Sequence, residues 1–143
     1  MATSELDHII EQYHQALDQF VNGRPMRLQE FFSHRDDVSL ANPVAPLARG
    51  WREVSQTQEQ ASSQFRESEP TDFERLVTYV TSELAFIVEM ERLRGKLVGM
   101  EDLRPIALRV TTVFRPEDGT WKIVHRHADS IASPRPLESI VQQ

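Results

Sequence analysis

The sequence predicts an α+β domain in which helices cover one face of a curved, mainly antiparallel sheet. Apolar residues recur at helical spacing early in the chain, and their period changes to two from Asp72 onward. An Asp-Gly turn within residues 116–119 then lies between two β-rich runs, Ile106 to Arg115 and Thr120 to Ala128, which is a strong hairpin signal. Helices followed by an antiparallel meander are typical of the α+β class.

Three helices are predicted before the meander. The first begins with Thr3-Ser4-Glu5, which can cap a helix, and ends at Asn22-Gly23, a good stop signal. Pro25 can open a second, short helix that ends near His34. A third helix, from Trp51 to about Arg66, is polar and rich in glutamine and has one buried edge.

The strands begin with a short run between Asp36 and Ala41. It is expected to stop at Asn42-Pro43, because proline cannot donate a hydrogen bond to a ladder. Residues 43–50 are expected to form a loop. Two longer strands, Phe73 to Thr81 and Leu84 to Leu93, then lead into the hairpin.

The length of the chain, 143 residues, indicates one domain with enough buried surface for a core and a modest cavity. We assign this domain to residues 1–130. Residues 131–143 contain two prolines and a few apolar residues, so we expect an extension that is either docked or disordered.

Composition excludes several function classes. The chain has 22 acidic and 16 basic residues, a net charge of −6, whereas nucleic-acid binding requires a basic surface. It has no cysteine, which excludes disulfides, thiolate nucleophiles and cysteine metal sites. The polar start and the absence of a long apolar run lead us to expect a cytoplasmic protein with no membrane partner.

Five short motifs, in this order along the chain, together resemble the nuclear transport factor 2-like superfamily, and within it the SnoaL-like branch. They are Tyr13 to Leu17, Phe31 to Val38, Asn42-Pro43-Val44, Arg49-Gly50-Trp51 and Trp121 to His127. The resemblance implies a cystatin-like conical barrel with three helices, a strongly bent sheet, an internal pocket and a homodimer through the outer sheet face. The superfamily contains isomerases, cyclases, hydrolases, dehydratases and non-catalytic domains, so function has to be argued from the site.

A comparison with ketosteroid isomerases suggests three pocket residues. By resemblance, Tyr13 stands where that family has its oxyanion tyrosine, Asn42 where it has the catalytic base, and Thr112 where it has a second oxyanion acid. Asparagine cannot take up a proton, so these neutral groups suit binding better than general-base catalysis. Each also has a purely structural interpretation: a core tyrosine, a turn residue and a β-former. Trp51 is expected mainly to anchor the third helix, with its indole at the pocket rim as the lesser alternative.

Two histidines offer a different interpretation of the hairpin. His125 and His127 share one parity of their strand, and Glu89 and Glu91 have the same spacing on a neighbouring strand. Together they could form a metal site. They could equally form a ladder of complementary charges on an outer face, and we expect no metal.

Arg126 lies on the opposite parity from the histidines, with residues that suit the lining of a cavity. These are Phe86, Val88, Met90, Leu108, Val110, Thr112, Val124 and Ala128. The run from Trp121 to His127 also resembles the association domain of calcium/calmodulin-dependent protein kinase II, which implies pocket arginines on the parity of Arg126. A buried arginine needs an anionic partner, either a carboxylate-bearing ligand or an internal acid.

Three functional hypotheses follow. The first is a small-molecule binding protein for a carboxylate-bearing or aromatic metabolite, with Tyr13, Asn42, Trp51, Thr112 and Arg126 as ligand contacts and no cofactor. The second is an isomerase, cyclase, dehydratase or hydrolase with His127 or Asp129 as its base. The third is a non-catalytic module whose function is dimerisation or assembly.

Overall fold

The computed structural model describes residues 2–142, with side chains from Ser4 onward. Its helices are α1 (Ala2–Phe20), α2 (Met26–Glu30) and α3 (Gly50–Gln64), and a short 3-10 helix, η1 (Leu137–Ile140), lies near the end. Its strands are β1 (Ser39–Ala41), β2 (Ala48–Arg49), β3 (Phe65–Ser68), β4 (Asp72–Val80), β5 (Ala85–Leu97), β6 (Arg104–Glu117) and β7 (Thr120–Asp129). The predicted α+β class is confirmed.

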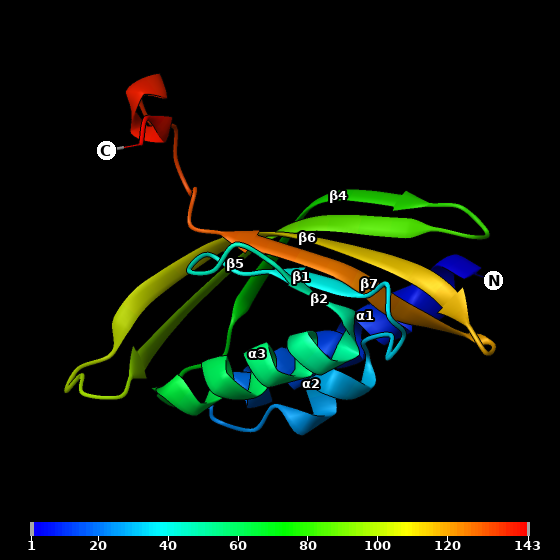
Figure 1. Ribbon diagram of the computed structural model, residues 1–143, viewed down its shortest axis with the longest axis horizontal. Helices are drawn as coiled ribbons and strands as arrows, with labels where there is room; N and C mark the ends of the chain where they lie inside the picture. The colour runs from blue at the N-terminus through cyan, green and yellow to red at the C-terminus, as the bar shows by residue number, and fades with distance from the viewer. Residues whose placement is uncertain (1, 143) are drawn as a thin grey trace.

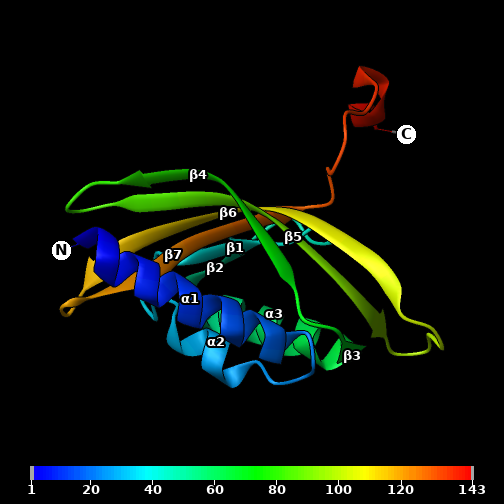
Figure 2. The same ribbon diagram turned by 180° about the vertical axis from the view of Figure 1, so that it is seen from behind.

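The strands of residues 2–142 form one mixed sheet in the order β2-β1-β7-β6-β5-β3, and β4 also pairs with β5. β1 runs parallel to β7, and the other pairs are antiparallel. β5 pairs with β4 through residues 85–92 and with β3 through residues 95–97. The sheet curls around the helices, and α1 and α3 lie side by side against its concave face (Figures 1 and 2). We call this the inner face, and the opposite one the outer face.

A hydrophobic core lies between the helices and the inner face. Its members on α1 recur three or four residues apart, which places them on one stripe of the helix. They include Leu6, Ile10, Tyr13 and Leu17, and they belong to the same cluster as Ile87, Phe114 and Ile123 of the sheet. The core therefore joins α1 directly to the central strands.

The hairpin between β6 and β7 turns at Asp118-Gly119, as predicted. These residues have φ angles of 52° and 84°. Positive φ at both central residues is what a two-residue loop needs to match the twist of its strands, and Asp-Gly tolerates it. Glu117 and Thr120 pair on either side of the turn.

A bulge in β7 breaks the alternation that the sequence suggests. Phe114 pairs with Ile123, but the preceding residue, Val113, pairs with His125, so Val124 is an extra residue. The simple alternation predicts that Trp121 and Ile123 share a face with the histidines, and this prediction is wrong. Trp121 and Ile123 are buried on the inner face, together with Arg126 beyond the bulge.

The predicted orientation of β5 is also wrong. Glu89 and Glu91 have the parity opposite to the one predicted to line the cavity, yet both are buried and pair with Val110 and Leu108. Val110 is itself buried and has the same parity on β6 as Thr112. Since side chains of directly paired residues lie on the same face, both carboxylates belong to the inner face. Phe86 and Val88, predicted to line the cavity, lie on the outer face.

Two short strands were not predicted. β2 falls within the expected loop at residues 43–50, and it pairs only with β1. β3 begins at Phe65, within the expected third helix. Both elements are too short to show a period of two, so their form depends on pairing with strands elsewhere in the chain.

The chain leaves the sheet after β7, and residues 130–142 project away from the domain (Figure 1). Leu137, Ile140 and Val141 in this tail are exposed. In the part of the chain that the structure describes, no helix has the length and apolar character needed to cross a membrane.

Candidate functional site

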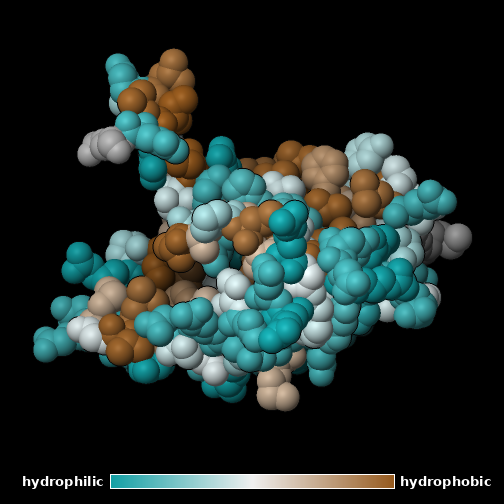
Figure 3. All heavy atoms as spheres, viewed as in Figure 1, coloured by the Kyte–Doolittle hydropathy of each residue, from teal (hydrophilic) through white to brown (hydrophobic). Residues whose placement is uncertain are grey.

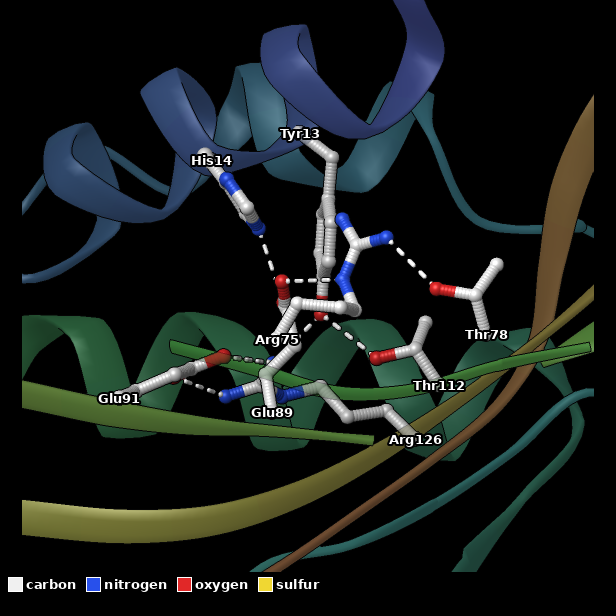
Figure 4. A network of polar contacts seen from close by, with 8 residues as sticks. All are labelled: Tyr13, His14, Arg75, Thr78, Glu89, Glu91, Thr112 and Arg126. Carbon is white, nitrogen blue, oxygen red and sulfur yellow. Dashed lines mark hydrogen bonds and ion pairs between the residues drawn. The ribbon is translucent and has the colours of Figure 1, made fainter. Parts of the chain in front are cut away.

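Four buried polar side chains meet between α1 and the inner face of the sheet (Figure 4). Arg126 on β7 donates hydrogen bonds to both carboxylate oxygens of Glu91 on β5, each at 2.9 Å. Nη1 of Arg126 also donates to the hydroxyl of Tyr13 on α1. That hydroxyl lies 3.2 Å from the hydroxyl of Thr112 on β6. We call Tyr13, Glu91, Thr112 and Arg126 the inner network.

The inner network is neutral as a whole, because it contains one guanidinium and one carboxylate. Burial by itself lowers the pKa of Arg126, but the adjacent Glu91 carboxylate outweighs this effect and raises the pKa above its ordinary value. Burial raises the pKa of Tyr13 to about 12, despite the opposing effect of Arg126. Tyr13 therefore remains a neutral hydroxyl, and Arg126 a permanent cation, near neutral pH.

A second cluster adjoins the inner network and reaches solvent. Nε2 of His14 on α1 donates to Glu89 at 2.8 Å, and Nε of Arg75 on β4 donates to the other carboxylate oxygen at 2.9 Å. The imidazole stacks on Phe73 with ring centroids 3.7 Å apart. The His14 side chain is 20% exposed, and that of Arg75 is 32% exposed. We call His14, Arg75 and Glu89 the rim cluster.

The carboxyl group of Glu89 is ionised in this setting. Burial alone would raise its pKa, but the hydrogen bonds and charges of His14 and Arg75 lower the pKa below the usual value. The carboxylate holds the imidazole in one orientation and leaves Nδ1 of His14 as the second ring nitrogen. An imidazole oriented in this way by a buried carboxylate is an arrangement that supports proton transfer.

Asn42 and Trp51 lie apart from the inner network. The side-chain oxygen of Asn42 accepts a hydrogen bond from the backbone of Val44 at 3.0 Å, so this residue caps its own turn. Trp51 is the second residue of α3, packs partly against the core and stacks on His34 with ring centroids 3.8 Å apart. These contacts agree with the structural interpretations of the two residues, Asn42 as a turn residue and Trp51 as an anchor of α3.

The residues proposed as bases, His127 and Asp129, lie at the far end of β7. His127 is exposed on the outer face. Asp129 accepts two hydrogen bonds from Arg109, at 2.8 and 3.1 Å. Burial would raise the pKa of Asp129, but these bonds hold the pKa below its usual value. A carboxylate stabilised in this way is a weak base.

The alternative metal site requires the histidines and glutamates to meet, and the sheet separates them. His125 and His127 are on the outer face, where Nδ1 of His125 lies 2.7 Å from the hydroxyl of Ser39. Glu89 and Glu91 are on the inner face. Their side chains therefore cannot bind one metal ion.

Two hollows on the surface lie outside the inner network. One, of about 370 Å³, is formed by the connection between β3 and β4 and by parts of β5 and β6, including Pro70, Leu93 and Ile106. The other, of about 520 Å³, lies where α1 leads into α2, and includes Gly23 and Met26. Neither contains a residue that the sequence suggested as a ligand contact.

The structure adds four residues that the sequence did not place in this interior: His14, Arg75, Glu89 and Glu91. The sequence contains one indication that the two glutamates are buried: Ala85, Ile87 and Leu93 are apolar and share their parity on the strand. It was ambiguous because Phe86 and Val88 make the other parity apolar as well. For His14 no pattern in the sequence indicated a partner on β5.

Comparisons with known proteins identify the family and the fold of this chain. The family model of the SnoaL-like domain matches residues 6–133, which is most of the chain. The chain belongs to the SnoaL-like domain family. A comparison of this SnoaL-like protein with curated proteins gives no significant match.

Solved structures with the same fold are distant in sequence. A ketosteroid isomerase-like protein from Erwinia carotovora atroseptica is 15% identical, with 92% of this SnoaL-like chain and 96% of the other covered and a TM-score of 0.75. A nuclear transport factor 2-like superfamily protein from Salmonella enterica serovar Typhimurium is 16% identical, with 96% of each chain covered and a TM-score of 0.74. A protein with a cystatin-like fold from Caulobacter vibrioides is 17% identical, with 96% and 93% covered and a TM-score of 0.66. These similarities confirm the predicted nuclear transport factor 2-like, cystatin-like fold.

The buried ion pair of this SnoaL-like domain gives a stability prediction. Glu91→Gln leaves the charge of Arg126 buried without a counter-ion, so we expect the free energy of unfolding to fall by about 3–5 kcal/mol. Urea denaturation followed by circular dichroism measures this loss.

Asp129→Asn is the matched control, because it removes a carboxylate from an arginine pair at the surface. We expect it to cost only a small fraction of the loss in Glu91→Gln. Equal losses in the two variants would contradict the central position that we assign to the Arg126–Glu91 pair.

Proposed function

We propose that this protein binds a neutral, oxygen-bearing aromatic small molecule between α1 and the inner face of its sheet. The observation that carries the proposal is the pairing of Arg126 with Glu91. The sequence left two anionic partners open for this arginine, a ligand carboxylate or an internal acid. Because Glu91 is that internal acid, a second carboxylate would add an unbalanced negative charge to a buried site. The aromatic, uncharged alternative is therefore favoured over the carboxylate-bearing one.

The inner network also supplies a polarised donor. Arg126 donates to the oxygen of Tyr13, which leaves the Tyr13 proton available to Thr112. Thr112 can then direct its own proton to a ligand oxygen, since a hydroxyl both accepts and donates. A chain of hydrogen bonds that starts at a buried cation is strengthened along its length. Such a donor suits a carbonyl or phenolic oxygen.

Membership of the SnoaL-like family is compatible with small-molecule binding but identifies no ligand. The fold of this SnoaL-like domain occurs in a ketosteroid isomerase-like protein and in a nuclear transport factor 2-like superfamily protein. The rim cluster gives the interior a polar, partly exposed edge at His14 and Arg75. A ligand entering beside this edge would pass from solvent to the inner network along α1.

Two probes with the same ring system, naphthol and naphthoate, test the proposal. We expect naphthol to bind at least about tenfold more tightly, as measured by isothermal titration calorimetry. Thr112→Val keeps the shape of the side chain but removes its hydroxyl, so we expect it to weaken naphthol binding by about five- to tenfold. Thr111→Val changes the same residue type on the outer face and should leave the affinity unchanged. Tighter binding of naphthoate would refute the proposal.

A second candidate function is proton transfer, and the rim cluster is the observation that favours it. The earlier candidates for a base, His127 and Asp129, lie on the outer face or are held by Arg109. His14 instead has a buried carboxylate on one ring nitrogen and partial exposure to solvent. In this alternative, His14 removes a proton from a bound substrate, and Glu89 orients the ring and stabilises the imidazolium.

Nitrobenzisoxazole tests this candidate, because its ring opens when a base removes a carbon-bound proton. If His14 is the base, the rate above background should fall about 100-fold in His14→Gln, with Glu89→Gln also impaired. His8→Gln, an exposed histidine on the same helix, is the control and should retain the rate. Equal rates in both histidine variants would exclude His14 as the base.

We also propose that the protein forms a homodimer through the outer face. Dimerisation was the third hypothesis, and here it accompanies ligand binding on the inner face. Val77 and Tyr79 on β4 are 43% and 51% exposed, and Tyr79 stacks on Phe86 of β5. Leu76 and Leu84 nearby are exposed as well. Figure 3 shows hydrophobic side chains along the edge of the molecule where β4 and β5 lie. Contiguous apolar surface of this kind favours association.

Light scattering at micromolar concentration tests the dimer. We expect a dimer for the wild type and a monomer for Val77→Glu combined with Tyr79→Lys, since these changes place charges in the proposed interface. Met26→Glu, on an exposed apolar residue of α2, should leave the dimer intact. A monomeric wild type would contradict the proposal.

A further inference from the structure

Gln58 occupies an unusual position on α3. It lies on a stripe with Val54 and Ser62, at four-residue spacing, and all three are buried. Val54 belongs to the same hydrophobic core as Tyr13, and Ser62 donates a hydrogen bond to the backbone oxygen of Phe20 on α1 at 2.7 Å. The stripe therefore faces the interior between the helices and the sheet, and Gln58 lies at its centre.

The amide of Gln58 makes no hydrogen bond. The residue is 2% exposed, and among residues 2–142 neither Nε2 nor Oε1 has a partner. The other buried polar side chains of this interior contrast with it, since Arg126, Glu91, Tyr13, Thr112 and Ser62 are all paired. Burying an amide without partners destabilises a fold, so a group of this kind calls for a specific explanation.

We propose that Gln58 is a ligand contact and that it recognises a lactam or an equivalent cis-amide on the bound molecule. This inference rests on the proposed binding of a neutral aromatic ligand. A primary amide presents a donor and an acceptor side by side, and a lactam presents the complementary pair. The lactam N–H donates to Oε1 of Gln58, and its carbonyl accepts from Nε2. The two bonds together satisfy both atoms that the protein leaves unpaired.

The arrangement assigns different parts of the ligand to different walls of the interior. Thr112 on the sheet offers a donor to one oxygen, and Gln58 on α3 offers a paired donor and acceptor. Both groups are uncharged, which agrees with the internal pairing of Arg126 and Glu91. A ligand anion would satisfy only Nε2 of Gln58 and would leave Oε1 without a donor.

The first experiment needs no ligand and compares Gln58→Met with Ser62→Ala. Methionine keeps the unbranched shape but has no amide, so we expect the melting temperature of the ligand-free protein to rise by about 3 °C. Ser62→Ala removes a paired hydroxyl from the same stripe, and its melting temperature should fall. If Gln58→Met lowers the melting temperature as Ser62→Ala does, the amide is satisfied within the protein, for instance by internal water, and the inference is wrong.

The second experiment uses quinolinone, an aromatic lactam, and its N-methyl derivative, which lacks the N–H. By calorimetry, we expect the wild type to bind quinolinone at least about tenfold more tightly than the derivative, and Gln58→Met to bind both equally weakly. No preference in the wild type overturns the inference. If naphthol still binds and depends on Thr112, the proposed function stands without it; if neither probe class binds, both fail.

Discussion

The ion pair between Arg126 and Glu91 sets the charge balance in the interior of this domain. The two residues lie on β7 and β5, so the pair spans the intervening strand β6 on the inner face. Neither charge can be buried alone, and a buried pair adds little to stability by itself. Its main effect is on geometry, because the guanidinium also donates to Tyr13 and so ties α1 to β7 and β5. The hydroxyl of Tyr13 contacts β6 through Thr112. The helix, the sheet and the charge balance therefore depend on one another.

This constraint divides the two faces of the same strands between two kinds of interaction. The inner face carries paired charges and hydroxyls within an apolar core, which suits selection of a small molecule by hydrogen bonds. The outer face carries Val77, Tyr79 and Phe86, which suits contact with another protein surface. The rim cluster lies where the inner face meets solvent, since the side chains of His14 and Arg75 are partly exposed.

The sequence predicted the long elements well because their periods are clear over many residues, as in α1 and in the β6–β7 hairpin. It placed Tyr13, Thr112 and Arg126 in one interior but not Glu91, the counter-ion of Arg126. Alternation along β5 could not separate the faces, since both parities begin with apolar residues, and the pairing of Glu89 with the buried Val110 resolves them. The contact of His14 with Glu89 depends on how α1 lies across the sheet. No local pattern records such a packing angle.

The bulge at Val124 limits how the sequence of β7 can change during evolution. On one side of it Trp121 and Ile123 belong to the core, and on the other side Arg126 does, because one extra residue offsets the alternation. Point substitutions at these positions preserve the offset. Losing or gaining a single residue there would exchange Arg126 for its histidine neighbours in the interior, and Glu91 would lose its counter-ion. A domain of this fold with one residue more or fewer between Ile123 and Arg126 would therefore place a different side chain opposite Glu91, even when the surrounding residues are the same.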